Sequence, residues 1–414
     1  MFEKTIELKL KNPHPAQQKI LQEAKRFNVL KCGRRFGKTL LSEELAIQPA
    51  LDGYPVGYWN ATYKDVSKVW DQIKFICYGI TKRKDEQLKQ IHLITGGQID
   101  FWSMEDPNSG RGFAYKRAIM DECEKARNFE EAWKQAIRPT LTDYEGDAWF
   151  LSTPKFGKSY FKEITKNKER AGFENWNSWT MTSYDNPFLK KSEIDEARLQ
   201  YDDLTFKCEY LAEDVDLVGK PFAYCFDLQK HIADFEMDNS QELFISFDFN
   251  VDPITALASQ YVDGRIRIIK EFRLSNSNIY ELCERIKVEY PNALILVSGD
   301  ATGHNRSALT SGTMNYYTVI QSELNLSDGQ MKQPSINPAV KDSRVLLNSI
   351  LQNYPPAIHS DCKYLIEDLK YVEVTDDGDI NKTKDKHQSH LLDCFRYLLN
   401  TFYSHLLNMN VENF

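Results

Sequence analysis

The sequence has 414 residues, of which 42% are hydrophobic and 12% aromatic, and its formal net charge is −8. This length and composition predict two or three domains with packed cores. The charge alone argues against a broad basic surface for nucleic acid but does not exclude a local basic groove. No apolar run reaches the ~18 residues of a membrane span, and no signal peptide is recognised at the amino terminus. Eight scattered cysteines without a CxxC pair indicate a reduced cytosolic protein that lacks a zinc site.

A glycine-rich segment stands between a strand-like run, residues 27–31, and a helix-like run, residues 40–47. Its members are Gly33, Arg34, Arg35, Phe36, Gly37, Lys38 and Thr39. Strand, loop and helix in this order are the context of a phosphate-binding loop. Glycines let backbone N–H groups point at a phosphate, while Lys38 would reach the β- and γ-phosphates and Thr39 would hold Mg²⁺. Because Cys32 replaces the usual first glycine, the alternative is a glycine-rich turn beside a basic residue.

Gln17 lies shortly upstream of this loop, in His14-Pro15-Ala16-Gln17. An amide both donates and accepts hydrogen bonds, so Gln17 is a candidate for reading an adenine edge. The alternative is a proline-rich start of a short helix.

Two later strand-like runs end in polar residues. Residues 117–120 lead into Asp121 and Glu122, and residues 148–151 lead into Ser152 and Thr153. In a nucleotide hydrolase Asp121 would join the Mg²⁺ shell, and Glu122 would orient and deprotonate the attacking water. Small hydroxyl residues at a strand's carboxyl end are well placed to sense a γ-phosphate. The alternative is a strand that ends in solvated acids.

Arg111 lies in a flexible loop, residues 109–112. It is either a solvated side chain or an arginine finger that stabilises transition-state charge. Strands alternate with helical stretches through this half, which predicts a mostly parallel sheet.

The pattern changes near residue 182. A turn-like segment is followed by a charged helical stretch over residues 192–211, and a linker surrounds Gly219. The predicted division is residues 1–181, residues 182–239 as a lid and linker, and residues 240–414. Asp263 and Gly264 separate two strand-like runs and predict a hairpin.

The second half places three acids in apolar surroundings. Asp248 ends a strand, Asp300 ends a later strand, and Asp393 lies in a mostly apolar helix of residues 389–406, where His390 is a weaker candidate. Two Mg²⁺ or Mn²⁺ ions need such oxygen ligands to clamp a phosphodiester. Each acid taken singly is more readily structural, but the trio occurs in an order resembling ribonuclease H.

Together these motifs resemble the large terminase subunit of tailed bacteriophages over nearly the whole chain. Residues 33–39 are similar to the family's shortened Walker A, Asp121 and Glu122 to its Walker B pair, and residues 152–154 to its coupling motif. Gln17 is similar to its adenine-reading glutamine. The resemblance implies an α/β chain in which an ASCE-type P-loop NTPase domain precedes a ribonuclease-H-like, mixed-sheet nuclease domain. Arg111 only roughly matches the family's trans-acting finger, and Arg34 competes for that role.

The resemblance further implies an ATPase that translocates double-stranded DNA into a procapsid and a two-metal endonuclease that cuts concatemers. ATP with Mg²⁺ is the implied cofactor of the first site, and two Mg²⁺ or Mn²⁺ ions of the second. The implied partners are DNA, a portal, a procapsid and a small terminase subunit, with a homo-oligomeric ring on the portal in the host cytoplasm. The alternatives are a helicase or repair ATPase with an appended nuclease, and a nucleotide-gated scaffold with an inactive nuclease.

Overall fold

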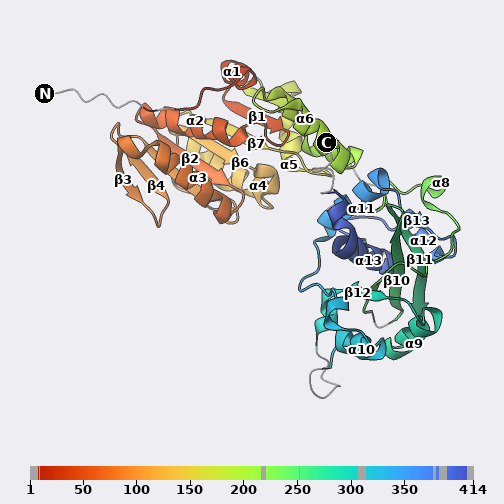
Figure 1. Ribbon diagram of the computed structural model, residues 1–414. Coiled ribbons are helices and arrows are strands. Elements are labelled where there is room, and N and C mark those ends of the chain that lie inside the picture. The colour runs from red at the N-terminus through yellow and green to blue at the C-terminus, as the bar shows by residue number, and fades with distance from the viewer. Residues whose placement is uncertain are drawn as a thin grey trace. The chain divides into compact units, whose positions relative to one another are not determined.

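The computed structural model describes residues 8, 10–215, 221–250, 252–305, 314–375, 379–381 and 389–407, drawn in Figure 1. The chain forms two compact units. Unit 1 comprises Met1–Asp195 and Phe206–Asp216, and unit 2 comprises Glu196–Thr205 and Leu217–Phe414. Residues 182–239, predicted as a lid and linker, are thus shared between the two units, and the predicted division into three segments stays a prediction. None of the described helices combines the length and hydropathy that a membrane crossing requires.

Unit 1 is built on an eight-stranded sheet in the order β3-β4-β5-β2-β6-β7-β1-β8. Neighbouring strands from β5 to β8 are parallel, whereas β3, β4 and β5 form antiparallel pairs. The predicted mostly parallel sheet is therefore confirmed. The strands are β1 (Phe27–Cys32), β2 (Pro55–Asn60), β3 (Thr81–Asp85), β4 (Gln90–Leu93), β5 (Gln98–Ser103), β6 (Arg117–Asp121), β7 (Asp147–Ser152) and β8 (Trp176–Met181).

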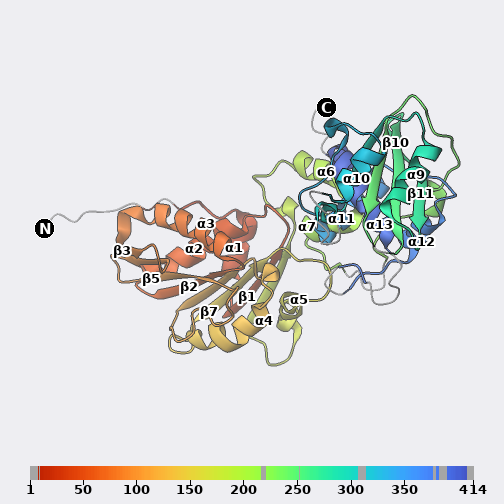
Figure 2. The ribbon, with the colours of Figure 1, turned by 90° about the horizontal axis from the view of Figure 1, so that it is seen from below.

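Helices cover both faces of this sheet, as Figure 2 shows. Because successive strand residues point to opposite faces, Leu30 of β1 packs in the core beneath α2 and α3, while Val29 packs in the core beneath α4 and α5. Burial on both faces explains why β1 is buried at every position. The helices are α1 (Pro15–Gln22), α2 (Lys38–Leu51), α3 (Tyr63–Ile76), α4 (Phe129–Glu131) and α5 (Tyr160–Thr165).

Unit 2 contains a mixed five-stranded sheet in the order β12-β9-β10-β11-β13. Strand β10 runs antiparallel to β9 and β11, and β12 runs parallel to β9. The hairpin predicted at Asp263 and Gly264 is confirmed, since these residues join β10 and β11. The strands are β9 (Leu243–Asp248), β10 (Ile254–Val262), β11 (Arg265–Leu274), β12 (Ile295–Gly299) and β13 (Ala357–Ile358).

The helices of unit 2 fall into two groups on the two faces of its sheet. Leu347, Leu365 and Phe395, from α11, α12 and α13, share one core, and Ile286 and Ile320, from α9 and α10, lie in the other. The helices are α8 (Leu228–His231), α9 (Ile279–Glu289), α10 (Tyr316–Glu323), α11 (Val340–Asn353), α12 (Lys363–Tyr371) and α13 (His390–Leu398). The predicted final helix is α-helical only over α13 and continues as a π-helix over Leu399–Tyr403.

The single charged helix predicted over residues 192–211 is wrong. Two helices occur there, α6 (Lys191–Gln200) and α7 (Asp203–Glu209). The buried carboxylate of Asp202 accepts hydrogen bonds from the backbone N–H groups of Leu204 and Thr205 at 3.0 Å each. An aspartate that caps a new helix in this way ends the preceding one.

Candidate nucleotide and metal sites

The predicted phosphate loop joins the end of β1 to the start of α2. Two of its residues adopt left-handed backbone conformations, Arg35 with φ of 62° and Gly37 with φ of 106°. A side chain on Gly37 would bring a Cβ within 2.9 Å of the Gln17 amide nitrogen, and one on Gly33 would lie 2.3 Å from the Tyr210 carbonyl oxygen. Gly33 is therefore required by the close approach of the Tyr210 backbone, and Gly37 by its left-handed conformation. The first turn of α2 directs N–H groups without intrahelical partners toward the loop.

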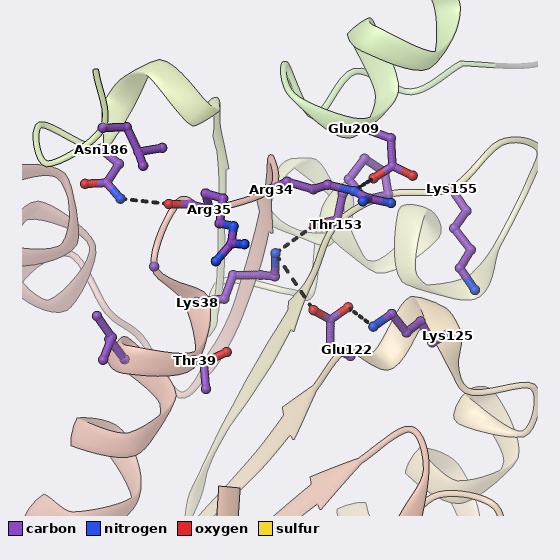
Figure 3. A pocket seen from close by; sticks show the side chains of 14 residues that line it. Arg34, Arg35, Lys38, Thr39, Glu122, Lys125, Thr153, Lys155, Asn186 and Glu209 are labelled. Carbon is purple, nitrogen blue, oxygen red and sulfur yellow. Dashed lines mark hydrogen bonds and ion pairs between the residues drawn. The ribbon is translucent and has the colours of Figure 1, made fainter. Parts of the chain in front are cut away.

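A cavity of about 640 Å³ opens above this loop and is drawn in Figure 3. It is lined by five cationic side chains and two acidic ones, together with Thr39, Thr153 and Asn186. This excess of positive charge suits a polyphosphate. The cationic residues are Arg34, Arg35, Lys38, Lys125 and Lys155, and the acidic residues are Glu122 and Glu209.

Lys38 lies at the floor of the cavity and is 8% exposed. Its ammonium group donates a 2.7 Å hydrogen bond to the hydroxyl of Thr153 and lies 4.0 Å from a carboxylate oxygen of Glu122. Burial acts to lower the pKa of Lys38, but the acidic groups nearby, including Cys32 and Glu122, outweigh it and raise that pKa. Lys38 is therefore a fixed positive charge.

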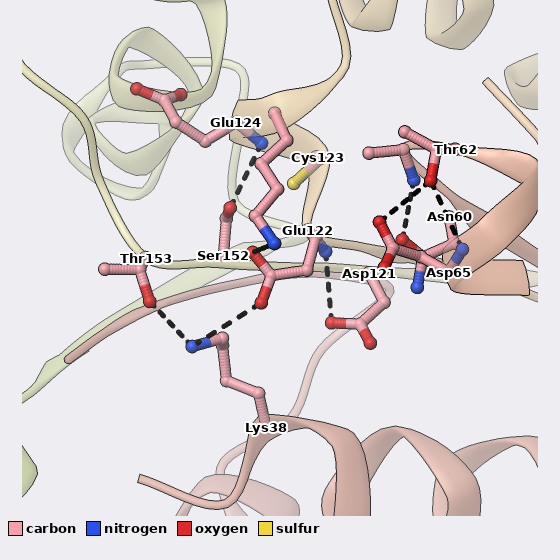
Figure 4. A network of polar contacts seen from close by, with 12 residues as sticks. Lys38, Asn60, Thr62, Asp65, Asp121, Glu122, Cys123, Glu124, Ser152 and Thr153 are labelled. Carbon is pink, nitrogen blue, oxygen red and sulfur yellow. Dashed lines mark hydrogen bonds and ion pairs between the residues drawn. The ribbon is translucent and has the colours of Figure 1, made fainter. Parts of the chain in front are cut away.

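The two predicted acids lie at the end of β6, as Figure 4 shows. Asp121 is buried and accepts hydrogen bonds from the Glu122 backbone N–H at 3.0 Å and from the Tyr58 hydroxyl at 2.9 Å. Burial, and after it the charge of Glu122, raise the pKa of Asp121 to about 6. A buried carboxylate next to a second carboxylate is a donor set that fits Mg²⁺. A dication would offset both the desolvation of Asp121 and its repulsion by Glu122. Thr39 lines the cavity, whereas Asp121 is buried and does not line it.

The residues at the end of β7 divide into two roles. Thr153 faces the cavity, whereas Ser152 is fully buried and its hydroxyl accepts a 3.1 Å hydrogen bond from the backbone N–H of Glu124. The Glu124 carboxylate in turn accepts hydrogen bonds from the Lys155 N–H at 3.2 Å and the Ser159 hydroxyl at 2.7 Å. Ser152 and Glu124 thereby hold the turn after Glu122 against the loop that carries Thr153.

Five predicted residues of unit 1 do not line the cavity, namely Gln17, Gly33, Arg111, Asp121 and Ser152. The Gln17 amide donates a 3.0 Å hydrogen bond to the Gly37 carbonyl and accepts one of 3.1 Å from the His14 backbone N–H, so it contacts the back of the phosphate loop. Arg111 lies in the exposed segment between β5 and β6, with its guanidinium 3.4 Å from the Asn108 side-chain oxygen. The adenine-reading role of Gln17 and the finger role of Arg111 stay predictions.

Two residues that line the cavity and contact the phosphate loop had no individual role predicted from the sequence. One is Glu209, whose carboxylate lies 2.6 Å from the Arg34 guanidinium. The other is Asn186, whose amide donates a 2.7 Å hydrogen bond to the Arg35 carbonyl. Both come from the region that follows β8, far from the loop in sequence. The only signal was their place within residues 182–239, predicted as a lid and linker, which indicates a region rather than a residue.

In unit 2 the three predicted acids converge on one end of the sheet. Asp248 ends β9, Asp300 directly follows β12 and Asp393 lies in the first turn of α13. Burial raises the pKa of Asp248, which accepts a 3.3 Å hydrogen bond from His390, and the charges of Asp393 and Asp300 raise it further. The Asp248 carboxylate therefore lies within electrostatic reach of both Asp393 and Asp300.

Each of these acids contacts another polar side chain. Asp393 pairs with the buried Arg396, Asp300 accepts a 2.7 Å hydrogen bond from Asn337, and Asp248 accepts one from Asn250. Within the described ranges, no group of three His, Cys, Asp or Glu side chains is arranged to hold a metal ion. The predicted metal role of the trio is therefore not confirmed by this geometry and stays a prediction.

Comparison with known proteins finds similarity to one family. Residues 29–234 match the family model described as "Terminase large subunit, T4likevirus-type, N-terminal". The chain is 25% identical over 390 residues to the large terminase subunit of Escherichia phage T5, covering 90% of this chain and 86% of that protein. The predicted resemblance to phage large terminase subunits is confirmed.

Solved terminase structures share the fold. The large terminase of a thermophilic bacteriophage superimposes with a TM-score of 0.62 at 17% identity, covering 94% of this chain and 98% of that one. The same phage protein in complex with ATP-gamma-S superimposes with a TM-score of 0.60 at 15% identity, covering 94% and 98%. The predicted fold class, a P-loop NTPase domain followed by a ribonuclease-H-like domain, is confirmed.

Proposed function

We propose that this chain is a terminase large subunit in which ATP hydrolysis in unit 1 drives translocation of double-stranded DNA into a procapsid. The observation that carries the proposal is the 4.0 Å approach of Lys38 and Glu122 across a cation-lined cavity at a phosphate-loop helix. This pairing sets a phosphate-binding cation beside a candidate base for the attacking water.

In unit 1 we assign a separate role in ATP hydrolysis to each of these residues. Backbone N–H groups of the loop and Lys38 would bind the phosphates, while Thr39 and Asp121 would hold Mg²⁺. Bound Mg²⁺ would neutralise charge that develops on the phosphate oxygens. Glu122 would orient and deprotonate water, and Thr153 would connect the phosphates to the end of β7. Arg34 lies in the cavity and Arg111 outside it, which favours Arg34 for a role within one subunit and Arg111 for a role in trans.

For unit 2 we propose metal-dependent cleavage of concatemeric DNA at Asp248, Asp300 and Asp393. The raised pKa of Asp248, caused by burial and by the neighbouring acids, supports this assignment because bound cations would offset the repulsion. Two Mg²⁺ or Mn²⁺ ions would activate the nucleophile and stabilise the leaving oxygen. Arg396 would have to release Asp393 for Asp393 to act as a ligand.

The partners we propose are those of a packaging motor: double-stranded DNA, a portal on a procapsid, and a small terminase subunit, in the host cytoplasm. A ring of copies on the portal would supply Arg111 to a neighbouring subunit. A nucleotide-gated scaffold with an inactive nuclease is the second candidate, and the pairing of Asp393 with Arg396 favours it.

The experiment that tests the proposal measures both activities on the full chain. ATP hydrolysis is followed with Mg²⁺ in the presence and absence of linear double-stranded DNA, and plasmid cleavage is followed with Mn²⁺ in the presence and absence of a chelator. We expect DNA-stimulated hydrolysis and chelator-sensitive cleavage. Hydrolysis without any cleavage would support the scaffold, and the absence of hydrolysis would overturn the motor assignment.

A further inference from the structure

Helix α13 begins without a capping side chain of its own. Ser389, the residue before its first turn, adopts a left-handed conformation with φ of 88°, and its buried hydroxyl has no hydrogen-bond partner among the described residues. Backbone N–H groups at a helix start lack intrahelical acceptors, so buried ones need acceptors from elsewhere. This start matters for the candidate nuclease site, because the first turn of α13 carries both His390 and Asp393.

The acceptor is the carboxylate of Asp368, which comes from α12. Its Oδ1 accepts a 3.3 Å hydrogen bond from the Ser389 N–H. Its Oδ2 accepts hydrogen bonds from the N–H groups of Leu391 and Leu392 at 3.2 and 3.1 Å. Asp368 is buried, and its negative charge faces the positive end of the α13 dipole. A side chain of α12 therefore caps α13 and fixes its first turn.

The turn that Asp368 holds also determines where two candidate nuclease residues lie. The Asp393 N–H donates a 2.7 Å hydrogen bond to the Ser389 carbonyl, so the place of Asp393 depends on the position of Ser389. The His390 ring lies 3.3 Å from a carboxylate oxygen of Asp248, at the end of β9. A shift of the α13 start would therefore move Asp393 and His390 together relative to Asp248.

Helix α12 begins in the same way, which provides a comparison within unit 2. The Glu271 carboxylate, from β11, accepts hydrogen bonds from the N–H groups of Tyr364 and Leu365 at 3.0 and 2.8 Å. Cys362, the residue before α12, makes no side-chain cap. Because α12 carries none of the three candidate acids, Glu271 is a helix cap of the same chemical kind on a different helix.

We propose that Asp368 is a positioning residue of the nuclease, which holds the start of α13 so that Asp393 stays within reach of divalent cations bound at Asp248. This inference rests on the proposed nuclease function of the three acids. Asp368 acts through the backbone of α13, because both of its oxygens accept hydrogen bonds from N–H groups. Functional groups must be held to within about 0.5 Å of their working positions, so a displaced turn should weaken cation binding.

The test measures Mn²⁺ binding by calorimetry, and plasmid cleavage over a range of Mn²⁺ concentrations, on the full chain. Asp368→Ala should weaken Mn²⁺ binding about tenfold, as is typical for loss of a group that orients a metal ligand. Cleavage should need correspondingly more Mn²⁺ and should approach the parent rate at saturating Mn²⁺. Asp368→Asn, which keeps one acceptor oxygen, should lie between the parent and Asp368→Ala, and it decides by the same criteria if Asp368→Ala does not fold.

Glu271→Ala is the matched control, because it removes a buried helix cap and a negative charge from the same unit. It should lower the urea midpoint of unfolding, as Asp368→Ala does, but change Mn²⁺ binding less than about twofold. In the Asp393→Asn background, Asp368→Ala should leave Mn²⁺ binding unchanged, because the ligand that Asp368 positions is already lost.

Three outcomes would overturn the inference while the nuclease assignment stands. They are an unchanged Mn²⁺ dependence in Asp368→Ala, an equal shift in Glu271→Ala, and a loss of cleavage that excess Mn²⁺ does not restore. A parent chain that cuts no DNA with Mn²⁺ would instead overturn the proposed nuclease function, and the inference with it.

Discussion

Lys38 donates a 2.7 Å hydrogen bond to the hydroxyl of Thr153. The two residues come from the start of α2 and the loop after β7, 115 positions apart. The contact links Lys38, which we expect to bind the phosphates, to Thr153 at the end of β7, which we expect to sense them.

Removing the Thr153 hydroxyl should release Lys38 from this position. We expect Thr153→Val to lower the turnover of ATP hydrolysis roughly tenfold, because Lys38 would lose its alignment while the shape of the side chain is kept. Steady-state hydrolysis measures this, with Thr153→Ser as the matched control that retains the hydroxyl. Equal rates for Thr153→Val and Thr153→Ser would show that the hydrogen bond has no catalytic part.

The roles of Lys38 and Glu122 separate binding from chemistry. Lys38→Ala should abolish hydrolysis by weakening phosphate binding, whereas Glu122→Gln should retain nucleotide binding and lose at least ~10²-fold in turnover. Nucleotide affinity and single-turnover hydrolysis are measured in parallel. Near-normal turnover in Glu122→Gln would move the catalytic base to another residue.

Arg111 lies outside the cavity of its own chain, so a catalytic role for it requires a second copy. Specific hydrolysis activity should then rise steeply with protein concentration, and Arg111→Ala should flatten that rise without changing nucleotide affinity. Lys82→Ala, in the exposed strand β3, is a control for loss of a surface charge. An Arg111→Ala variant with an intact concentration dependence would exclude the trans role.

The nuclease proposal predicts that the two activities separate. In the full chain, Asp248→Asn, Asp300→Asn and Asp393→Asn should each nearly abolish plasmid cleavage with Mn²⁺, because a metal-binding charge is lost, while ATP hydrolysis persists. A chelator should stop the parent, and Asp361→Asn, an exposed acid before α12, should cut normally. If all three variants cut like the parent, the trio is structural.

Asp368 predicts a pH dependence of stability. Its buried carboxylate accepts hydrogen bonds from the N–H groups of Leu391 and Leu392 at 3.2 and 3.1 Å, and burial nonetheless raises its pKa from 3.8 to about 6. Between these values the folded chain holds a proton that the unfolded chain has released. The contribution of Asp368 to the free energy of unfolding should therefore fall as pH rises from about 4 to 6, by at most about 3 kcal/mol at about 1.4 kcal/mol per pKa unit.

Urea unfolding of the parent and of Asp368→Asn at several pH values in this range measures that contribution. The variant should show a shallower decline with pH, and Asp361→Asn should follow the parent. Parallel curves for the parent and Asp368→Asn would show that Asp368 does not carry the linkage.

Local sequence was sufficient for the phosphate loop and the hairpin. Gly33, Gly37 and Lys38 lie within six positions of one another between a strand and a helix, so their geometry follows from adjacent residues and short-range sterics. The turn at Asp263 and Gly264 followed from the same kind of short-range chemistry. The order of the acids along the chain indicated a ribonuclease-H-like second half, because strand ends in one sheet bring distant residues to a common edge.

Tertiary structure alone decided which partner each of these side chains meets. Glu209 reaches Arg34, the Gln17 amide contacts the Gly37 carbonyl, and Arg396 pairs with Asp393. These contacts depend on how separate helices and strands pack. Burial favours them, because charged groups and amides removed from water need polar partners. A sequence motif identifies the residues that carry the chemistry. The charged groups next to them are determined by the packing of distant segments, which no local pattern predicts.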